Sequence, residues 1–466
     1  MIKLPLALAA FAISAPLFAQ TVPPPPPPPI TVAPWIDALR DDALANDLYA
    51  FDITEGLTTE VGPRAAGTAA EARARAWSVS KLSAMGFSNV RVETFDMPVW
   101  IRGPESAEIL APFPQKMVVA ALGNSASTGP AGVTGQVVAF DNVDALRAAP
   151  DAAVRGKIVF VDHRMMPTQD GSGYGQFGAP RRAGPTLASQ KGAIAIVVRS
   201  IGTDRHRIPH TGTMSFANGA RPIPAGALSI PDAEQLVRIL ARGKPVTLRL
   251  RLESATIPSA QSGNVIADLI GRDPSLPPVL IACHLDSWDQ APGALDDAAG
   301  CGIVTAAAKR IMNAGRPLRT IRVVWFGAEE VGLFGGLDYL ARHGKEPHHA
   351  AAESDFGADR IWKVVSKLGE SRRDEARMIG AALAPLGIVT GALDEAGGSD
   401  IGPLLASGVP GVGLNQDGTR YFDVHHTPDD TLDKVDPAQM RQNVAAWTAM
   451  LAVLSGGVEP KARARR

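Results

Sequence analysis

The hydrophobic pattern near the start of the chain has the period of a helix. In "EARARAWSVSKLSAMGF" the apolar side chains recur on one helical face, at Ala74, Trp77, Leu82 and Met85. Gly86 then supplies a helix stop, and "NVRVETF" alternates as a half-exposed strand does. The pattern predicts a helix followed by a strand.

The texture changes between residues 118 and 255, where short β-type runs recur: "GQVVAF", "KIVFVD", "AIAIVVRS" and "VTLRLRLES". In the last run Leu248, Leu250 and Leu252 alternate with arginines, so the leucines should face a core. We predict an inserted β-rich domain over 118–255, with His206 and His210 in one of its loops.

Strands and helices alternate over residues 256–456. "PVLIAC", "TIRVVWFGAEE" and "VPGVGL" are typical of buried strands, whereas "AGCGIVTAAAKRIM" and "PAQMRQNVAAWTAMLAVL" are helical. Such alternation predicts an α/β fold in which a mainly parallel central sheet is flanked by helices on both faces. We assign 34–117 to the N-terminal part of this same domain.

The two ends of the chain are set apart from the fold. Residues 1–20 have the charged start, apolar stretch and small residues of a signal peptide, although an uncleaved anchor is the alternative. Residues 21–33 form a proline-rich linker, and 457–466 a basic tail. We therefore expect a secreted or periplasmic protein with no membrane span in the mature chain.

The charge and the cysteine content of the chain argue against two classes of protein: nucleic-acid-binding proteins and disulfide-rich scaffolds. The formal net charge is -1 and no broad basic field is present, which makes nucleic acid an improbable partner. Cys283 and Cys301 are the two cysteines, so a disulfide-rich scaffold is excluded. The sequence leaves two alternatives for this pair: a disulfide between the two cysteines, or two buried free thiols.

Acidic and histidine side chains gather where the predicted strands of the last region end. They are His284 and Asp286 after "PVLIAC", Glu329 and Glu330 after "IRVVWFGA", Asp355 in "AAAESD", Asp400 in "GGSDIG", and His425 and His426 in "HHTPDDT". In open α/β sheets, ligands bind just beyond the carboxyl ends of the strands. These side chains are therefore expected to converge.

Imidazole and carboxylate are the ligands that Zn²⁺ accepts, and two such ions can share a carboxylate. The chain offers a complete set for a two-zinc site: His284, Asp296, Glu330, Asp355 and His426. Asp286 could accept the second imidazole N–H of His284. Glu329 would remain free as a general base, and Asp297 suits a helix N-cap.

The ordered series "HLDSWD…GALDDAAG", "AEE", "ESD" and "HHT" resembles the two-zinc exopeptidases that include bacterial aminopeptidases and glutamate carboxypeptidases. "TEVGPRAAGT" and "PHTGTMSF" are also similar to that family, with the plasma-type glutamate carboxypeptidases the nearest branch. The likeness extends from about residue 35 to about residue 454.

The resemblance implies a role for each site residue. The five ligands would hold two Zn²⁺ per chain, with Asp296 as the bridge, Glu329 as the general base and Asp286 as the orienting carboxylate. His426 is favoured over His425 because the family ligand directly precedes Thr or Ser. Tyr421 and Asp400 are the expected substrate contacts. The insertion would be a protease-associated domain, and a homodimer is expected.

These observations together predict a secreted zinc-dependent exopeptidase that hydrolyses short peptides or dipeptides by a metal-activated water, with Glu329 as base. Aminopeptidase, carboxypeptidase and dipeptidase specificity remain open. Two alternatives are a single-zinc glutaminyl cyclase of the same fold and a non-enzymatic recognition scaffold. The complete ligand set favours the hydrolase over both.

Overall fold

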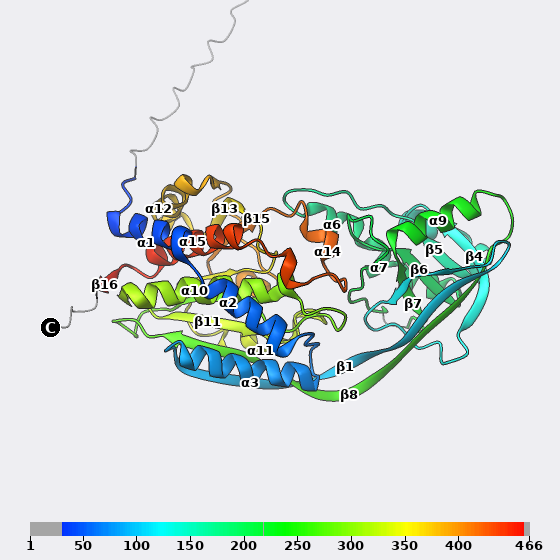
Figure 1. The fold of residues 1–466 in the computed structure, drawn as a ribbon, viewed down its shortest axis with the longest axis horizontal. Helices are drawn as coiled ribbons and strands as arrows, with labels where there is room; N and C mark the ends of the chain where they lie inside the picture. The colour runs from blue at the N-terminus through cyan, green and yellow to red at the C-terminus, as the bar shows by residue number, and fades with distance from the viewer. Residues whose placement is uncertain (1–29, 218, 461–466) are drawn as a thin grey trace, which may run out of the picture.

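The computed structural model describes residues 30–217 and 219–460 (Figure 1). The predicted signal peptide, most of the proline-rich linker and most of the basic tail lie outside the described residues. Within them, the chain forms two lobes joined by a pair of long strands (Figure 1).

The larger lobe contains both ends of the described chain. Its helices are α1 (Pro34–Asn46), α2 (Tyr49–Gly56), α3 (Ala69–Ala84), α10 (Ala299–Ala314), α11 (Phe334–His343), α12 (Arg373–Leu383), α13 (Gly402–Ala406), α14 (Tyr421–Val424) and α15 (Pro437–Leu454). Its sheet strands besides the connecting pair are β9 (Val279–His284), β11 (Ile321–Phe326), β12 (Ala350–Glu353), β13 (Ile361–Lys367), β14 (Val389–Thr390) and β15 (Gly411–Gln416). A short pair, β10 (Gly315–Pro317) and β16 (Val458–Pro460), closes its C-terminal end.

The order of strands in this lobe is β14-β13-β15-β12-β9-β11, and β11 continues to β8 (Thr247–Leu269). The strands β15, β12, β9 and β11 are mutually parallel, whereas β13 runs antiparallel to β15 and parallel to β14, and β8 runs antiparallel to β11. The prediction of a mainly parallel α/β sheet with flanking helices is therefore confirmed. Four neighbouring parallel strands end at the same edge of the sheet.

The second lobe lies between the connecting strands. Its strands are β2 (Gln115–Met117), β3 (Val119–Ala121), β4 (Val133–Phe140), β5 (Ile158–Val161), β6 (Ala195–Arg199) and β7 (Ala225–Leu228). Its helices are α4 (Val143–Ala148), α5 (Asp151–Val154), α6 (Ser172–Phe177), α7 (Ala179–Arg182), α8 (Gly184–Gln190) and α9 (Ile230–Leu240). Strands β4 to β7 are parallel, so this lobe is α/β in character; its short helices carry too few turns to leave a clear pattern in the sequence.

The long strands β1 (Ser88–Ala111) and β8 pair antiparallel along the lower edge in Figure 1 and run through both lobes. The leucines 248, 250 and 252 of β8 are fully buried beneath α9, as their alternation predicts. Because β8 continues unbroken past residue 255, the two lobes share one strand at the boundary expected there.

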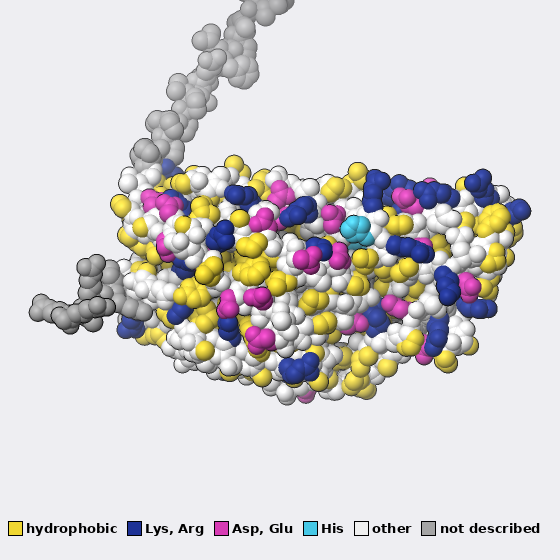
Figure 2. Space-filling model, in the orientation of Figure 1, with side chains coloured by type: hydrophobic (Ala, Val, Ile, Leu, Met, Phe, Trp, Pro, Cys, Tyr) yellow, Lys and Arg dark blue, Asp and Glu magenta, His cyan; other side chains and the backbone are white. Residues whose placement is uncertain are grey.

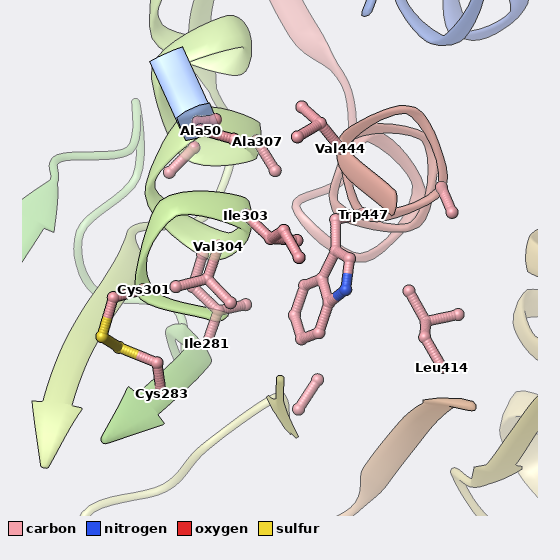
Figure 3. Close-up of a cluster of buried hydrophobic side chains, with 14 of the residues drawn as sticks. Ala50, Ile281, Cys283, Cys301, Ile303, Val304, Ala307, Leu414, Val444 and Trp447 are labelled. Atoms are coloured by element: carbon pink, nitrogen blue, oxygen red, sulfur yellow. A yellow bond between two sulfur atoms is a disulfide. The ribbon is translucent and has the colours of Figure 1, made fainter. Parts of the chain in front are cut away.

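The main core lies between the sheet and α10, α15 and α2, with Trp447 and Trp325 fully buried in it. Figure 3 shows Cys283 of β9 bonded to Cys301 of α10, next to Ile281, Val304 and Trp447. The two cysteines are therefore bridged, which settles the alternatives left open by the sequence. The disulfide fixes the start of α10 beside the residue that precedes His284.

On the face shown in Figure 2, acidic and basic side chains are interspersed over both lobes. A search of the described residues found no helix that combines the length and apolarity needed to cross a membrane.

Candidate metal centre

Four strand ends bring the predicted ligands to one place. His284 is the last residue of β9, Glu330 follows β11, Asp355 follows β12, and His426 follows β15 and α14. These strands are neighbours in the sheet, so their carboxyl ends lie side by side.

Asp296 lies between two histidines. Nε2 of His284 is 3.2 Å from Oδ1 of Asp296 and 3.3 Å from Oδ1 of Asp355. Nε2 of His426 is 3.3 Å from Oδ2 of Asp296 and 3.0 Å from Oε2 of Glu330. The five predicted ligands thus form two groups that share one carboxylate, the arrangement that a bridged pair of metal ions requires.

His425 also approaches this centre. Its Nε2 is 3.5 Å from Oδ2 of Asp296, and its ring stacks on that of His426 with centroids 3.5 Å apart. Burial lowers the pKa of His425, and the neighbouring His426 lowers it further. In the described part of the chain, only the imidazole of His426, and not that of His425, contacts Glu330. This contact favours His426 as the ligand.

The loop that carries Asp296 is held by three buried side chains. Asp430 accepts N–H groups from Leu295 and Asp296 at 2.7 and 3.1 Å. Asp297 accepts from the N–H groups of Gly300 and of His284, so it ties the loop to the first turn of α10 and to β9, although the N-cap position of α10 is Ala298. The peptide bond between Asp296 and Asp297 is cis.

Arg64 supplies the third support. Its guanidinium is fully buried and donates to the carbonyl oxygens of Leu285, Pro292 and Gly293. It therefore fixes the segment between β9 and Asp296. This arginine belongs to the "TEVGPRAAGT" stretch, more than 200 positions earlier in the chain.

Asp286 contacts the backbone of the segments that carry the predicted ligands. Its carboxylate accepts the N–H groups of Glu329 and Glu330 at 3.0 and 3.4 Å, so it orients the turn that carries the expected base. For His284, the nearer partner of Nδ1 is the backbone carbonyl of Asp286 at 3.0 Å, with the carboxylate at 3.7 Å. The imidazole is oriented by this residue mainly through its main chain.

The centre has an excess of buried negative charge. Burial, and then the charge of Asp296, raises the pKa of Glu330 to about 7. Burial and Asp296 likewise raise the pKa of Asp430 to about 7. Burial raises the pKa of Glu329 well above its usual range, and the charge of Asp355 adds to this. Carboxylates in this situation require cations nearby to remain ionised at neutral pH.

Two oxygens at the centre are poorly satisfied. Within the described part of the chain, the buried Oε1 of Glu330 has no hydrogen-bond partner, and the buried Oδ2 of Asp296 has only the Nε2 atoms of His426 and His425 nearby, at 3.3 and 3.5 Å. Unpaired buried carboxylate oxygens are costly. Imidazole nitrogens and ionised carboxylates are the donors that Zn²⁺ prefers, so the residues present fit a zinc pair.

The two expected substrate contacts lie in different surroundings. Tyr421 is 6% exposed, packs its ring 4.7 Å from that of Phe356, and lines a cavity that also borders Leu295, the neighbour of Asp296. Asp400 is fully buried and accepts the N–H of Gly336 at 3.1 Å, which leaves its carboxylate no surface for a substrate. The backbone of this segment is held by Glu353, whose carboxylate accepts the N–H groups of Asp400 and Ile401.

The second lobe contacts the ligand segment directly. Nδ1 of His210 is 2.7 Å from the carbonyl oxygen of His425, and its Nε2 contacts the carboxylate of Asp204. The N–H of Thr211 donates to the carbonyl oxygen of His426 at 3.0 Å, while Nδ1 of His426 is 3.4 Å from the carbonyl of Thr211. His210 belongs to "PHTGTMSF", a stretch that the sequence analysis places in a loop and finds similar to the exopeptidase family.

Four supporting residues therefore escape sequence reasoning: Arg64, His210, Glu353 and Asp430. Each is buried and bonded to backbone groups far away in sequence, and such partners leave no local pattern. His348 is also buried, at 7% exposed, because its ring packs against Tyr339.

Comparison with known proteins identifies the family. A model of peptidase family M28 matches residues 264–451. Carboxypeptidase Q of Bos taurus is 34% identical over 407 residues, which covers 86% of this chain and 84% of that protein. The crystal structure of an M28 peptidase precursor from Shewanella amazonensis has a TM-score of 0.88 at 42% identity and covers 92% of this chain and 98% of the other.

BSAP, a zinc aminopeptidase from Bacillus subtilis, shares the fold with a TM-score of 0.63 at 19% identity, over 87% of this chain and 94% of its own. The likeness to carboxypeptidase Q extends over both lobes, well beyond the region of the family model. The protein is therefore a metallopeptidase of family M28, similar to carboxypeptidase Q and to bacterial aminopeptidases.

Proposed function

We propose that the protein is an exopeptidase that hydrolyses short peptides at a pair of zinc ions held by His284, Asp296, Glu330, Asp355 and His426. The observation that carries this proposal is the shared carboxylate: Asp296 faces His284 through one oxygen and His426 through the other. Zinc at these positions would polarise the scissile carbonyl and lower the pKa of water.

Glu329 is the proposed general base. Its backbone is held by Asp286, on the same turn as the ligand Glu330. It takes a proton from the attacking water and gives it to the nitrogen of the leaving residue. Burial raises the pKa of Glu329, which makes its carboxylate a better proton acceptor than an exposed one.

Glu329→Gln tests this role. We expect two zinc ions per chain to remain, as measured by mass spectrometry of the metal, while kcat falls by about 10²–10⁴-fold, since the amide cannot accept the proton. Glu370→Gln, at a glutamate with a 79% exposed side chain, is the matched control and should retain full activity. Turnover of Glu329→Gln near that of the control would contradict the assigned base.

The zinc content and activity of the wild-type protein also separate the peptidase from the cyclase and from the recognition scaffold. One zinc per chain with ring closure of N-terminal glutamine, and no peptide cleavage, would indicate a cyclase. Peptide binding without turnover would indicate a recognition scaffold. A panel of dipeptides, longer peptides and N- or C-blocked peptides then decides among dipeptidase, aminopeptidase and carboxypeptidase specificity.

We also propose export and a homodimer, with residues 118–255 as a protease-associated domain. The Cys283–Cys301 disulfide supports an oxidising compartment, where such bonds persist. Cell fractionation with sequencing of the mature N-terminus would test export, and sedimentation of the purified protein would test the dimer.

A further inference from the structure

A cavity of about 330 Å³ adjoins the proposed metal centre at Glu330. Both lobes form its wall. Trp288 and Phe334 come from the large lobe, Trp100 from the long strand β1, and Thr213 from the second lobe. It is therefore placed to receive part of a molecule bound at the metals.

The position of Glu329 indicates which part of the peptide enters. The leaving nitrogen must lie near Glu329 to receive its proton. The chain runs from Glu329 through Glu330 and Val331 to Phe334, and the last three line the cavity. A residue that carries the leaving nitrogen and follows this turn would enter the cavity.

The opposite side of the centre has a different character. A second cavity, of about 320 Å³, touches Asp355 and is lined by Asp170, Glu353 and Glu395. Its acidic wall favours a cationic α-amine over an apolar or acidic group. This charge distribution agrees with a peptide whose amino end lies near Asp355.

One part of the wall of the first cavity is apolar; the rest includes hydroxyl, amide and carboxylate side chains. Met97 and Val99 of β1 are 3% and 4% exposed and form a cluster with Ala66, against which Val331 and Phe334 pack. An apolar side chain placed there would gain roughly 25 cal/mol for each Å² removed from water.

One cation, Arg102, is among the lining residues described for this cavity, and it is not available to an anion. Its Nε donates to Asp289 at 2.7 Å, Nη1 to Glu105 and to the carbonyl of Ala121, and Nη2 to Thr211 and Asp289. These bonds use all five N–H donors of a guanidinium. Two carboxylates also offset its charge, so an acidic side chain would gain little there.

We propose that this cavity binds the side chain of the leaving residue and selects apolar side chains over acidic ones. The inference rests on the proposed exopeptidase function. It names a substrate class: short peptides whose residue after the scissile bond is apolar, such as leucine or phenylalanine.

The test compares kcat/KM for the dipeptides Ala-Leu, Ala-Gly and Ala-Asp with the zinc-loaded full-length enzyme. We expect Ala-Leu to exceed Ala-Asp at least about tenfold, the scale of discrimination that an apolar pocket provides. Phe334→Ala should lower the ratio of Ala-Leu to Ala-Gly by about tenfold, because the wall that the leucine contacts is lost.

Ala66→Phe fills the same cavity and should lower that ratio too, which keeps the test valid if Phe334→Ala fails to fold. Phe113→Ala removes the same ring at a position 41% exposed on the second lobe, and should leave the ratio unchanged. A wild-type preference for Ala-Asp, or an unchanged ratio in both cavity variants, would overturn the inference. Failure to cleave any peptide would instead overturn the proposed function.

Discussion

His210 provides the sharpest test of how the second lobe supports the metal centre. Its ring is 1% exposed, bonded on one side to the carbonyl oxygen of His425 and on the other to the carboxylate of Asp204. His210→Ala removes both bonds. The carboxylate of Asp204 keeps the N–H of His206 as a partner but loses its only imidazole contact in the described structure.

The size of the effect follows from these contacts. A neutral hydrogen bond contributes about 0.5–1.5 kcal/mol and one to a charged group about 1.5–3 kcal/mol. Asp204 would also remain buried, with its side chain only 2% exposed. Removing one partner of such a buried pair costs about 3–5 kcal/mol in total, and we expect the free energy of unfolding of His210→Ala to fall by that amount.

A second effect should appear at the metal. The segment that His210 holds contains His426, whose left-handed backbone (φ 59°) is fixed by the N–H of Thr211. Loss of an outer contact of this kind weakens metal binding by about 10–100-fold. Urea unfolding measures the first effect, and competition for zinc with a coloured chelator measures the second.

His343→Ala is the control, because His343 bonds to Glu93 and Glu346 away from the metal centre. The side chains of His343 and Glu93 are 13% and 14% exposed, so this variant should lose some stability, but it should bind zinc as tightly as the wild type does. If His210→Ala stayed within about 1 kcal/mol of the wild type and held zinc with unchanged affinity, the reasoning about the second lobe would be refuted.

Two further predictions concern stability. Replacing Cys283 and Cys301 together by alanine opens a loop of 18 residues and should cost about 3 kcal/mol in guanidinium unfolding; a loss below about 1 kcal/mol would mean that packing alone holds this region. Leu250→Ala, at a fully buried position of β8, should cost about 2–5 kcal/mol, whereas Leu337→Ala, 50% exposed, should cost about 0.5 kcal/mol or less; equal losses would contradict the assignment of the core.

The sequence could predict the strand ends because they depend on local pattern. The continuous apolar runs before His284 and Glu329 are long enough for one buried strand each and end at polar side chains. Parallel neighbours then follow from the alternation of strands and helices. The structure brings these ends together in the order β15, β12, β9 and β11.

The supporting residues are beyond the reach of such reasoning. Arg64 bonds to the carbonyl of Gly293, 229 positions away, and His210 to that of His425, 215 positions away. A pattern of period 2 or 3.6 reports which face of an element is buried, but not which distant backbone group meets a polar side chain. Asp400 shows the opposite error. An acidic residue in a glycine-rich loop is expected to be exposed, yet Asp400 is fully buried.

The sequence by itself determined the chemical inventory: which imidazoles and carboxylates exist, and that they follow buried strands, because hydrophobic periodicity is local and ligand chemistry belongs to the residue type. Only the tertiary structure decided how the lobes meet, which carboxylates lie behind the predicted ligands, and where a cavity adjoins them. Those features depend on contacts between segments brought together by packing, and packing is a property of the whole chain.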